Sequence, residues 1–261
     1  MSLTTERMEI SGVAVDVATM GDGPALLYLH GGYGLVGHEA CLEKLAKTHK
    51  VIAPSLPGFE HSELPRAYTG IDDLAYFSLD LAGHLDLQDA ILVGACFGGW
   101  VAAEMAVRST TQFHRLVLID PLGMKFGDHL TRDITDIHAL YPADIDKALY
   151  ADPAKANRDT TRLSDKDLTA IVRNSEALAL FGWKPYMHNP KLGNWLHRVD
   201  IPTLVLWGEQ DGMVSTHYGR KYAKAIPGAR FESIANAGHY PSLEQPAVTA
   251  DLIAGFAGET R

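Results

Sequence analysis

One of the two cysteines stands at a position that could present a nucleophile. Cys96 belongs to the segment Gly94-Ala95-Cys96-Phe97-Gly98-Gly99, at the junction of an apolar run and a helical pattern. Small residues around one polar residue suit a strained strand-to-helix turn that projects the side chain. The N-terminus of the following helix would favour a thiolate. Cys96 is therefore a candidate nucleophile, although a lone cysteine is commonly a buried, inert residue.

An aspartate and a histidine follow later strand-like segments and could supply an acid and a base. Asp211 comes after the apolar run 203–207, and His239 lies in Ala237-Gly238-His239-Tyr240-Pro241, after the last strand-like run. The order nucleophile, acid, histidine is a known triad order. We expect His239 to take the thiol proton and Asp211 to orient the ring and stabilise the imidazolium.

Two other carboxylates compete for the acid role. Glu209 lies closer to the end of the apolar run than Asp211, so we expect it to point elsewhere. Asp120 directly follows the apolar run 116–119 and would reach the same edge of a parallel sheet. Asp120 therefore stays open as an alternative acid or as a helper.

The segment His30-Gly31-Gly32-Tyr33-Gly34 follows an early apolar run and could hold a developing oxyanion. We expect the backbone N–H of Gly32 to be one donor and that of Phe97 to be the other. His30 is interpreted as structural. The remaining histidines show no metal-ligand spacing, so we expect no metal site and no cofactor.

Apolar runs alternate with helical patterns along most of the chain. We expect strands at 13–17, 25–30, 51–53, 91–94, 116–119, 203–207 and 230–234, and helices at 39–48, 71–85, 98–108, 218–225 and 248–256. Continuous apolar strands separated by helices are typical of a parallel sheet covered on both faces. The predicted fold class is α/β.

No strand pattern appears between Pro121 and about Trp195, where several short helices are expected, one of them at 166–180 with Ser164 as its cap. We interpret residues 121–197 as a helical cap inserted over the carboxyl edge of a core formed by 1–120 and 198–261, where ligands of open α/β sheets bind. Candidate pocket residues are Tyr33, Met124, Trp183, Tyr186, Met187 and Tyr240.

The composition limits the range of partners. The 261 residues carry a formal net charge of −9 and show no basic stripe, which argues against a nucleic-acid partner. Two cysteines are too few for a disulfide framework. With no apolar leader or membrane-length run, we expect a cytoplasmic protein with a small-molecule substrate and no membrane partner. A homodimer stays open.

The chain resembles the α/β-hydrolase superfamily, above all its capped bacterial branch of carboxylesterases and meta-cleavage-product hydrolases. The resemblance covers nearly everything outside the cap. It rests on His30-Gly31-Gly32, Leu56-Pro57-Gly58-Phe59, Gly94-Ala95-Cys96-Phe97-Gly98-Gly99, Ile201-Pro202-Thr203 leading to Asp211, and Gly238-His239 followed by Glu244-Gln245-Pro246. It implies a mostly parallel eight-stranded sheet and a hydrolase of an ester, a lactone or the C–C bond of a vinylogous diketone, acting through a covalent acyl intermediate.

This sequence departs from the family pattern in two places. The loop after Phe59 usually carries glycine, and here it reads Glu60-His61-Ser62. The nucleophile position, normally serine, is Cys96, which is either a native thiol nucleophile or an engineered replacement for serine. Three alternatives stay open for function: an acyltransferase, a thioesterase, or a non-catalytic ligand-binding protein on this fold.

Overall fold

The computed structural model describes residues 4–128, 130–156 and 159–259. Residues 1–3, on which the expectation of no leader partly rests, lie outside the described part. The strands are β1 (Thr4–Ile10), β2 (Val13–Met20), β3 (Ala25–Leu29), β4 (Lys50–Pro54), β5 (Ala90–Ala95), β6 (Phe113–Ile119), β7 (Thr203–Gly208) and β8 (Arg230–Ile234). The α-helices are α1 (Glu39–Leu45), α2 (Ile71–His84), α3 (Phe97–Arg108), α4 (Pro142–Leu149), α5 (Asp165–Gly182), α6 (Thr216–Ala225), α7 (Pro241–Glu244) and α8 (Pro246–Ala257).

The eight strands form one sheet in the order β1-β2-β4-β3-β5-β6-β7-β8. β1 pairs antiparallel with β2, β2 pairs antiparallel with β4, and all later pairs are parallel. The expected mostly parallel eight-stranded sheet is therefore confirmed. Parallel neighbours bring the carboxyl ends of β3, β5, β6 and β7 to one edge, and the residues that follow these ends meet there.

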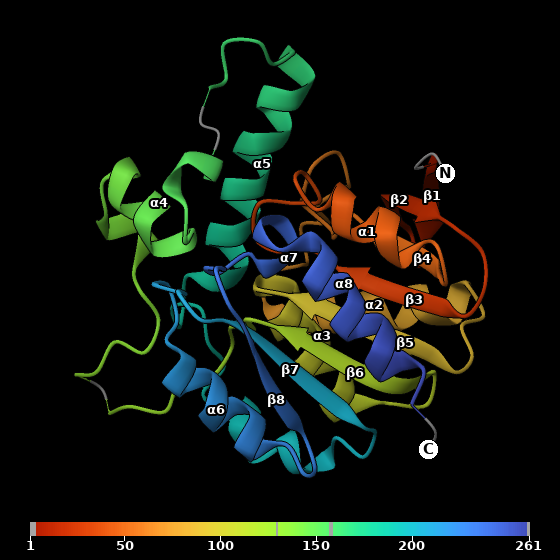
Figure 1. Cartoon of the computed structure of the whole chain (residues 1–261). Coiled ribbons are helices and arrows are strands. Elements are labelled where there is room, and N and C mark those ends of the chain that lie inside the picture. Colours follow the sequence, from red (N-terminus) through yellow and green to blue (C-terminus); the bar gives the residue numbers. More distant parts are fainter. Residues whose placement is uncertain (1–3, 129, 157–158, 260–261) are drawn as a thin grey trace.

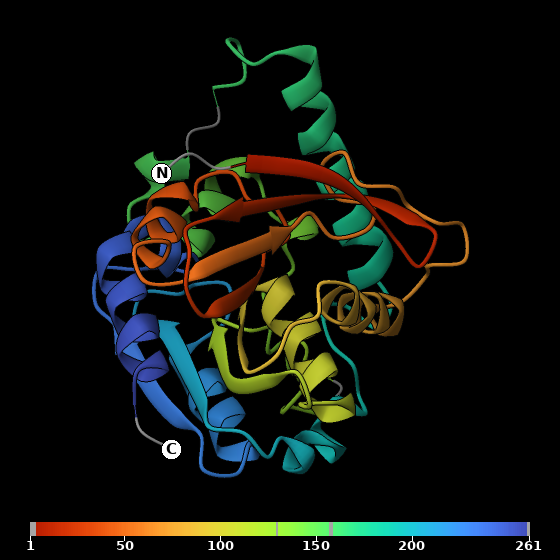
Figure 2. The same cartoon turned by 90° about the vertical axis from the view of Figure 1, so that its right-hand side faces the viewer.

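Helices cover both faces of the sheet (Figure 1). One apolar core joins α1 and α8 to the sheet through residues such as Leu42 and Ile253, and the other joins α2, α3 and α6 to the opposite face. Figure 2 shows α1 (orange) and α8 (blue) on the side of the sheet away from α2 (gold). β5 and β7 are buried along their whole length, and apart from Thr203 at the start of β7 their sequences are apolar.

The long connection between β6 and β7 carries α4 and α5 together with short 3₁₀ turns, at Ile137–Ala139, Pro153–Ala156, Leu192–Asn194 and Leu196–Arg198. In Figure 1, α4 and α5 (green) project beyond the body formed by the sheet and its flanking helices. α5 starts after Ser164, whose side chain accepts a hydrogen bond from the N–H of Asp167, as expected of an N-cap. Only isolated bridges, and no strand, occur among the described residues of this connection.

β1 is the strand that was absent from our expectations. Its sequence, Thr-Thr-Glu-Arg-Met-Glu-Ile, is largely polar because it lies at the sheet edge and is exposed over most of its length. Within the described residues, no helix is both long enough and apolar enough to span a membrane.

Candidate active site

The turn between β5 and α3 holds Cys96 in a strained conformation. Its φ is +53° and its ψ is −116°, a combination that non-glycine residues seldom adopt. The turn is fixed by hydrogen bonds: the N–H of Cys96 donates to the carbonyl of Ile119 over 2.8 Å, and the carbonyl of Cys96 accepts from Trp100 and Leu122. The neighbouring strand and helix thus hold the thiol at the carboxyl edge of the sheet.

Two glycines permit this turn. A Cβ atom on Gly98 would lie 2.3 Å from the carbonyl oxygen of Leu29, and one on Gly94 would lie 2.4 Å from that of Gly98. These contacts are with backbone, which cannot move aside cheaply. The pattern Gly-x-Cys-x-Gly is therefore a packing requirement of the turn.

The loop after β7 places Asp211 beside His239. Oδ2 of Asp211 lies 2.8 Å from Nδ1 of His239, and the other carboxylate oxygen accepts from the N–H groups of Met213 and Val214 at 2.8 and 2.9 Å. Both side chains are shielded from solvent. The carboxylate is thereby fixed by two backbone donors and presents its remaining oxygen to the ring.

The thiol of Cys96 and the ring of His239 form the buried electrostatic pair of the site. Burial alone would raise the pKa of the Cys96 thiol, but the charge and hydrogen bonding of His239 lower it below the usual thiol value, with help from backbone N–H groups. Burial alone would lower the pKa of His239, but the charges of Asp211 and Cys96 raise it well above 6.5.

Two backbone amides and a hydroxyl face the same sulfur. The N–H groups of Gly32 and Phe97 donate to Cys96 and favour its thiolate. These are the two residues expected to form the oxyanion hole. Tyr240 also contacts the sulfur; burial, followed by the charge of Cys96, raises the pKa of its hydroxyl well above the usual value.

His30 and Glu209 both have fixed hydrogen-bond partners away from the sulfur. Nε2 of His30 accepts from the N–H of Leu56 at 3.0 Å, and Nδ1 lies 2.7 Å from the carbonyl oxygen of Gly31. Glu209 is exposed and accepts a hydrogen bond from the hydroxyl of Ser233. Glu209 therefore does point elsewhere.

Asp120, the alternative acid, lies close to Asp211 and is fully buried. One oxygen accepts from the N–H of Gly208 at 3.0 Å, and the other has no hydrogen-bond partner among the described residues. Burial, followed by the charge of Asp211, raises the pKa of the Asp120 carboxyl well above its usual value. The surroundings of Asp120 therefore favour its protonated, neutral form.

Ligand atoms of Asp120, Asp211 and His239 lie within 4.8 Å of one another, close enough in principle to share a metal ion. Nδ1 of His239 already faces Asp211, and both acids accept backbone hydrogen bonds. This donor set suits proton transfer better than metal binding, because a cation there would displace the hydrogen bonds that orient the ring.

The expected pocket residues fall into two groups. Tyr240 contacts the sulfur, and the ring of Tyr33 lies against that of Tyr240 with ring centroids 6.1 Å apart. Tyr186 is near enough to interact electrostatically with Cys96. Trp183 is 61% exposed and packs against His138, so we leave it out of the proposed pocket. Met187 is buried, and its sulfur lies beside Gly182.

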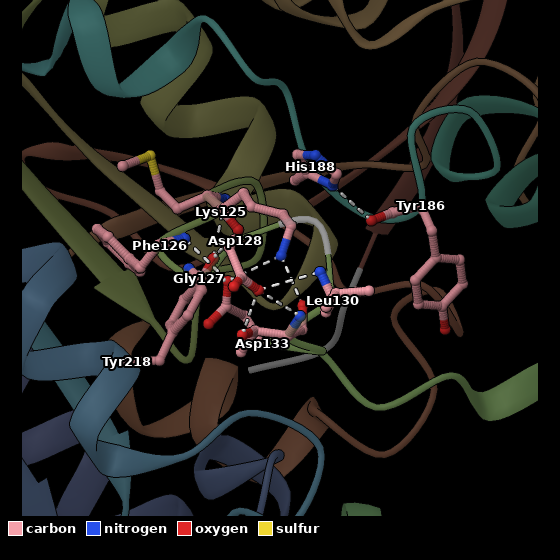
Figure 3. A network of polar contacts seen from close by, with 11 residues as sticks. Lys125, Phe126, Gly127, Asp128, Leu130, Asp133, Tyr186, His188 and Tyr218 are labelled. Atoms are coloured by element: carbon pink, nitrogen blue, oxygen red, sulfur yellow. Dashed lines mark hydrogen bonds and ion pairs between the residues drawn. The ribbon is translucent and has the colours of Figure 1, made fainter.

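A cavity of about 250 Å³ lies between the chain after β6 and Tyr186 and shares Met124 and Tyr186 with the expected pocket. Figure 3 shows the polar contacts of Lys125, Phe126, Gly127 and Asp133, which belong to this stretch of chain. Asp133 orders one wall, because it accepts hydrogen bonds from the N–H groups of Phe126 and Gly127. The hydroxyl of Tyr186 is bonded to backbone groups and is not free for catalysis. The lining residues are Met124, Lys125, Thr131, Arg132, Asp133, Ile134, Asp136, Tyr186 and His188.

Comparison with known proteins places this arrangement in a family. The model of the alpha/beta hydrolase family matches residues 26–252. The chain belongs to the alpha/beta hydrolase family. The expected fold class and the expected hydrolase class are thus confirmed.

Individual relatives are distant but cover nearly the whole chain. A 2-hydroxymuconate semialdehyde hydrolase from Pseudomonas sp. (strain CF600) is 25% identical over 264 residues, covering 95% of this chain and 92% of the relative. An uncharacterized protein of Mycobacterium tuberculosis is 26% identical, covering 92% of this chain and 77% of its own. The crystal structure of a meta-cleavage product hydrolase superposes with a TM-score of 0.82 at 20% identity, covering 98% of both chains, which shows the shared fold.

The sequence did not reveal which residues of α5 contact the site. Leu178 lies against Gly32, and Asn174 bonds to the neighbouring backbone. Helical spacing in α5 indicates only that one face is apolar. It does not indicate which loop that face will meet.

Proposed function

We propose that the protein hydrolyses a small carbonyl substrate through Cys96, His239 and Asp211, with a covalent acyl intermediate. The substrate class is an ester, a lactone or the C–C bond of a vinylogous diketone. The observation that carries the proposal is convergence on one sulfur: the His239 ring and the N–H groups of Gly32 and Phe97 all act on Cys96.

In the first half-reaction the Cys96 sulfur forms a bond to the substrate carbonyl carbon, and the carbonyl oxygen becomes an oxyanion. The N–H groups of Gly32 and Phe97, already directed at the sulfur, lie where they can donate to that oxygen. His239, holding the thiol proton, passes it to the leaving group as the bond between the carbon and that group breaks. A thioester on Cys96 remains.

In the second half-reaction water replaces the sulfur. His239 accepts a proton from water, the hydroxide attacks the thioester carbon, and the acid product leaves as the proton returns to the sulfur. Asp211 holds the ring through Nδ1 in both steps. Because the site is closed to bulk solvent, its charges act in a low-dielectric environment.

The C–C branch of the proposal is supported by the 25% identical 2-hydroxymuconate semialdehyde hydrolase, which spans nearly the same length. The pocket proposed for the substrate consists of Tyr33, Tyr240, Met187 and the cavity wall of Met124 and Tyr186. Residues 121–197 are proposed as the cap that closes it.

Paired Cys96→Ser and Cys96→Ala variants test the proposal. They should be compared with wild type on p-nitrophenyl esters, lactones, thioesters and ring-cleavage products. We expect wild type or the serine form to turn over at least one class with a burst, and the alanine form to be inactive. Greater activity in the serine form would indicate that cysteine replaces a serine.

Cys41→Ala is the matched control, because Cys41 is buried on α1 and belongs to the other apolar core. It should retain wild-type turnover. Turnover by Cys96→Ala would contradict the covalent mechanism. If the wild type and both Cys96 variants bind the tested esters, lactones or ring-cleavage products tightly but none of them shows a burst, the result would favour a ligand-binding protein instead.

A further inference from the structure

Asn174 is a buried amide near the middle of α5 whose two polar atoms both have partners outside the helix. Its Oδ1 accepts from the N–H of Glu60 at 2.7 Å, and its Nδ2 donates to the carbonyl oxygen of Tyr33 at 2.9 Å. Only 3% of the residue is exposed. Burying an amide is costly unless it is bonded, so these two contacts account for an asparagine at this position.

Glu60 holds the same loop from a second side. One carboxylate oxygen accepts from the N–H of Leu35 at 2.9 Å, and the other accepts from the hydroxyl of Ser55. Glu60 has a φ of +48°, which is strained for a residue other than glycine. We call residues 31–35 the oxyanion loop; its Tyr33 and Leu35 are bonded to Asn174 and Glu60.

Leu178 lies one helical turn beyond Asn174 and packs directly on Gly32. A Cβ atom on Gly32 would lie 2.7 Å from Cδ2 of Leu178. Residues four apart on a helix share a face, so α5 contacts the oxyanion loop with one polar and one apolar side chain. Leu178 therefore packs on Gly32, the loop residue whose N–H faces Cys96.

We propose that Asn174 is a positioning residue that fixes the oxyanion loop, so that the N–H of Gly32 stays directed at the reaction centre and α5 is coupled to the chemical step. This rests on the proposed function, because Gly32 matters to catalysis only if an oxyanion forms beside Cys96. Asn174 lies behind the loop and touches neither substrate nor sulfur in this scheme. Its loss should therefore reduce kcat more than it changes KM.

Two variants and one control test this. Asn174→Asp keeps the shape and the acceptor for Glu60 but turns an oxygen toward the carbonyl of Tyr33. Asn174→Ala removes both bonds. Ser175→Ala is the control, because Ser175 is the exposed neighbour on the same helix and its hydroxyl donates to the carbonyl of Ile171.

The first readout is kcat and KM on an ester that wild type turns over. We expect about a tenfold or greater loss of kcat in both Asn174 variants with little change in KM, and wild-type values for Ser175→Ala. If the alanine form does not fold, as judged by circular dichroism, the aspartate form decides.

The second readout needs no substrate. Alkylation of Cys96 by iodoacetamide is followed against pH by mass spectrometry, and its midpoint reports the groups facing the sulfur: His239, Tyr240 and the N–H groups of Gly32 and Phe97. We expect the midpoint to rise in both Asn174 variants, because a displaced Gly32 N–H stabilises the thiolate less. The control should not move.

The outcomes separate the two proposals. A wild type inert toward every substrate class would sink the proposed function, while the alkylation midpoint would still test the positioning of Gly32. A wild type that is active, with Asn174 variants matching Ser175→Ala in both readouts, would overturn the role of Asn174 alone.

Discussion

Nδ1 of His239 and Oδ2 of Asp211 lie 2.8 Å apart in a part of the protein closed to solvent. The carboxylate is held on its other side by the N–H groups of Met213 and Val214. The ring is thus held in one orientation through Nδ1, with Nε2 left for the sulfur. Removing the negative charge would free the ring to take the other tautomer.

Asp211→Asn is therefore expected to lower kcat/KM by about 10³–10⁴-fold while the fold is retained. The measurement is ester turnover under pseudo-first-order conditions. Glu209→Gln is the matched control, since Glu209 is an exposed acid on the same loop bonded to Ser233, and it should behave as wild type. Equal losses in both variants would show that the loop as a whole, and not the Asp211 charge, matters.

His239→Gln should raise the pKa of the Cys96 thiol. In the wild type, burial opposes the thiolate, but His239 and the backbone amides lower the pKa below the usual value of 9.0. With the imidazolium removed, the largest effect that favours the thiolate is lost and the alkylation midpoint should move upward. Cys41 serves as an internal reference, because burial raises its pKa to about 12. An unchanged midpoint would mean that His239 does not act on the sulfur.

Gly98→Ala and Gly255→Ala should have opposite effects on stability. A Cβ on Gly98 would lie 2.3 Å from the carbonyl oxygen of Leu29, while one on Gly255 meets nothing within 4 Å. Strain should cost the first variant about 1–3 kcal/mol or more. The second should gain about 0.5–1 kcal/mol from helix propensity. Thermal unfolding gives the sign directly, and a stable Gly98→Ala would argue against the tight turn at Cys96.

Strands buried on both faces could be predicted from the sequence, and the edge strand could not. Neither face of β5 or β7 meets water, so both are apolar apart from Thr203, and the residues that follow them could be placed at the carboxyl edge. β1 pairs only with β2 and is largely exposed, so its polar sequence gives no strand signal.

The candidate residues Cys96 and Asp211 were identifiable because each follows a largely apolar strand, and His239 because it follows the last strand-like run. The support of the oxyanion loop was not identifiable in this way. Asn174 and Glu60 are 114 positions apart, and their bond depends on where α5 lies against the loop after β4. Nothing local marks Asn174, since an asparagine within a helix is commonly exposed, and Glu60 stands out only as a departure from the glycine usual in its loop. Contacts of this kind follow from tertiary packing alone.

Asp120→Asn should become more stabilising relative to wild type as pH rises. Burial and the charge of Asp211 raise the folded-state pKa of Asp120 well above its usual 3.8. The folded protein therefore holds a proton that the unfolded chain releases, and the stability from this group is complete below about pH 3.8 and is lost as pH rises through the folded pKa. An asparagine imitates the neutral acid and can donate to Asp211, but pays no such penalty. Melting temperatures of variant and wild type from pH 4 to 9 measure the difference, with Asp22→Asn as an exposed control. A difference that stays flat across this range would show that Asp120 is ionised in the folded protein, and Asp120 would then rival Asp211 as the acid.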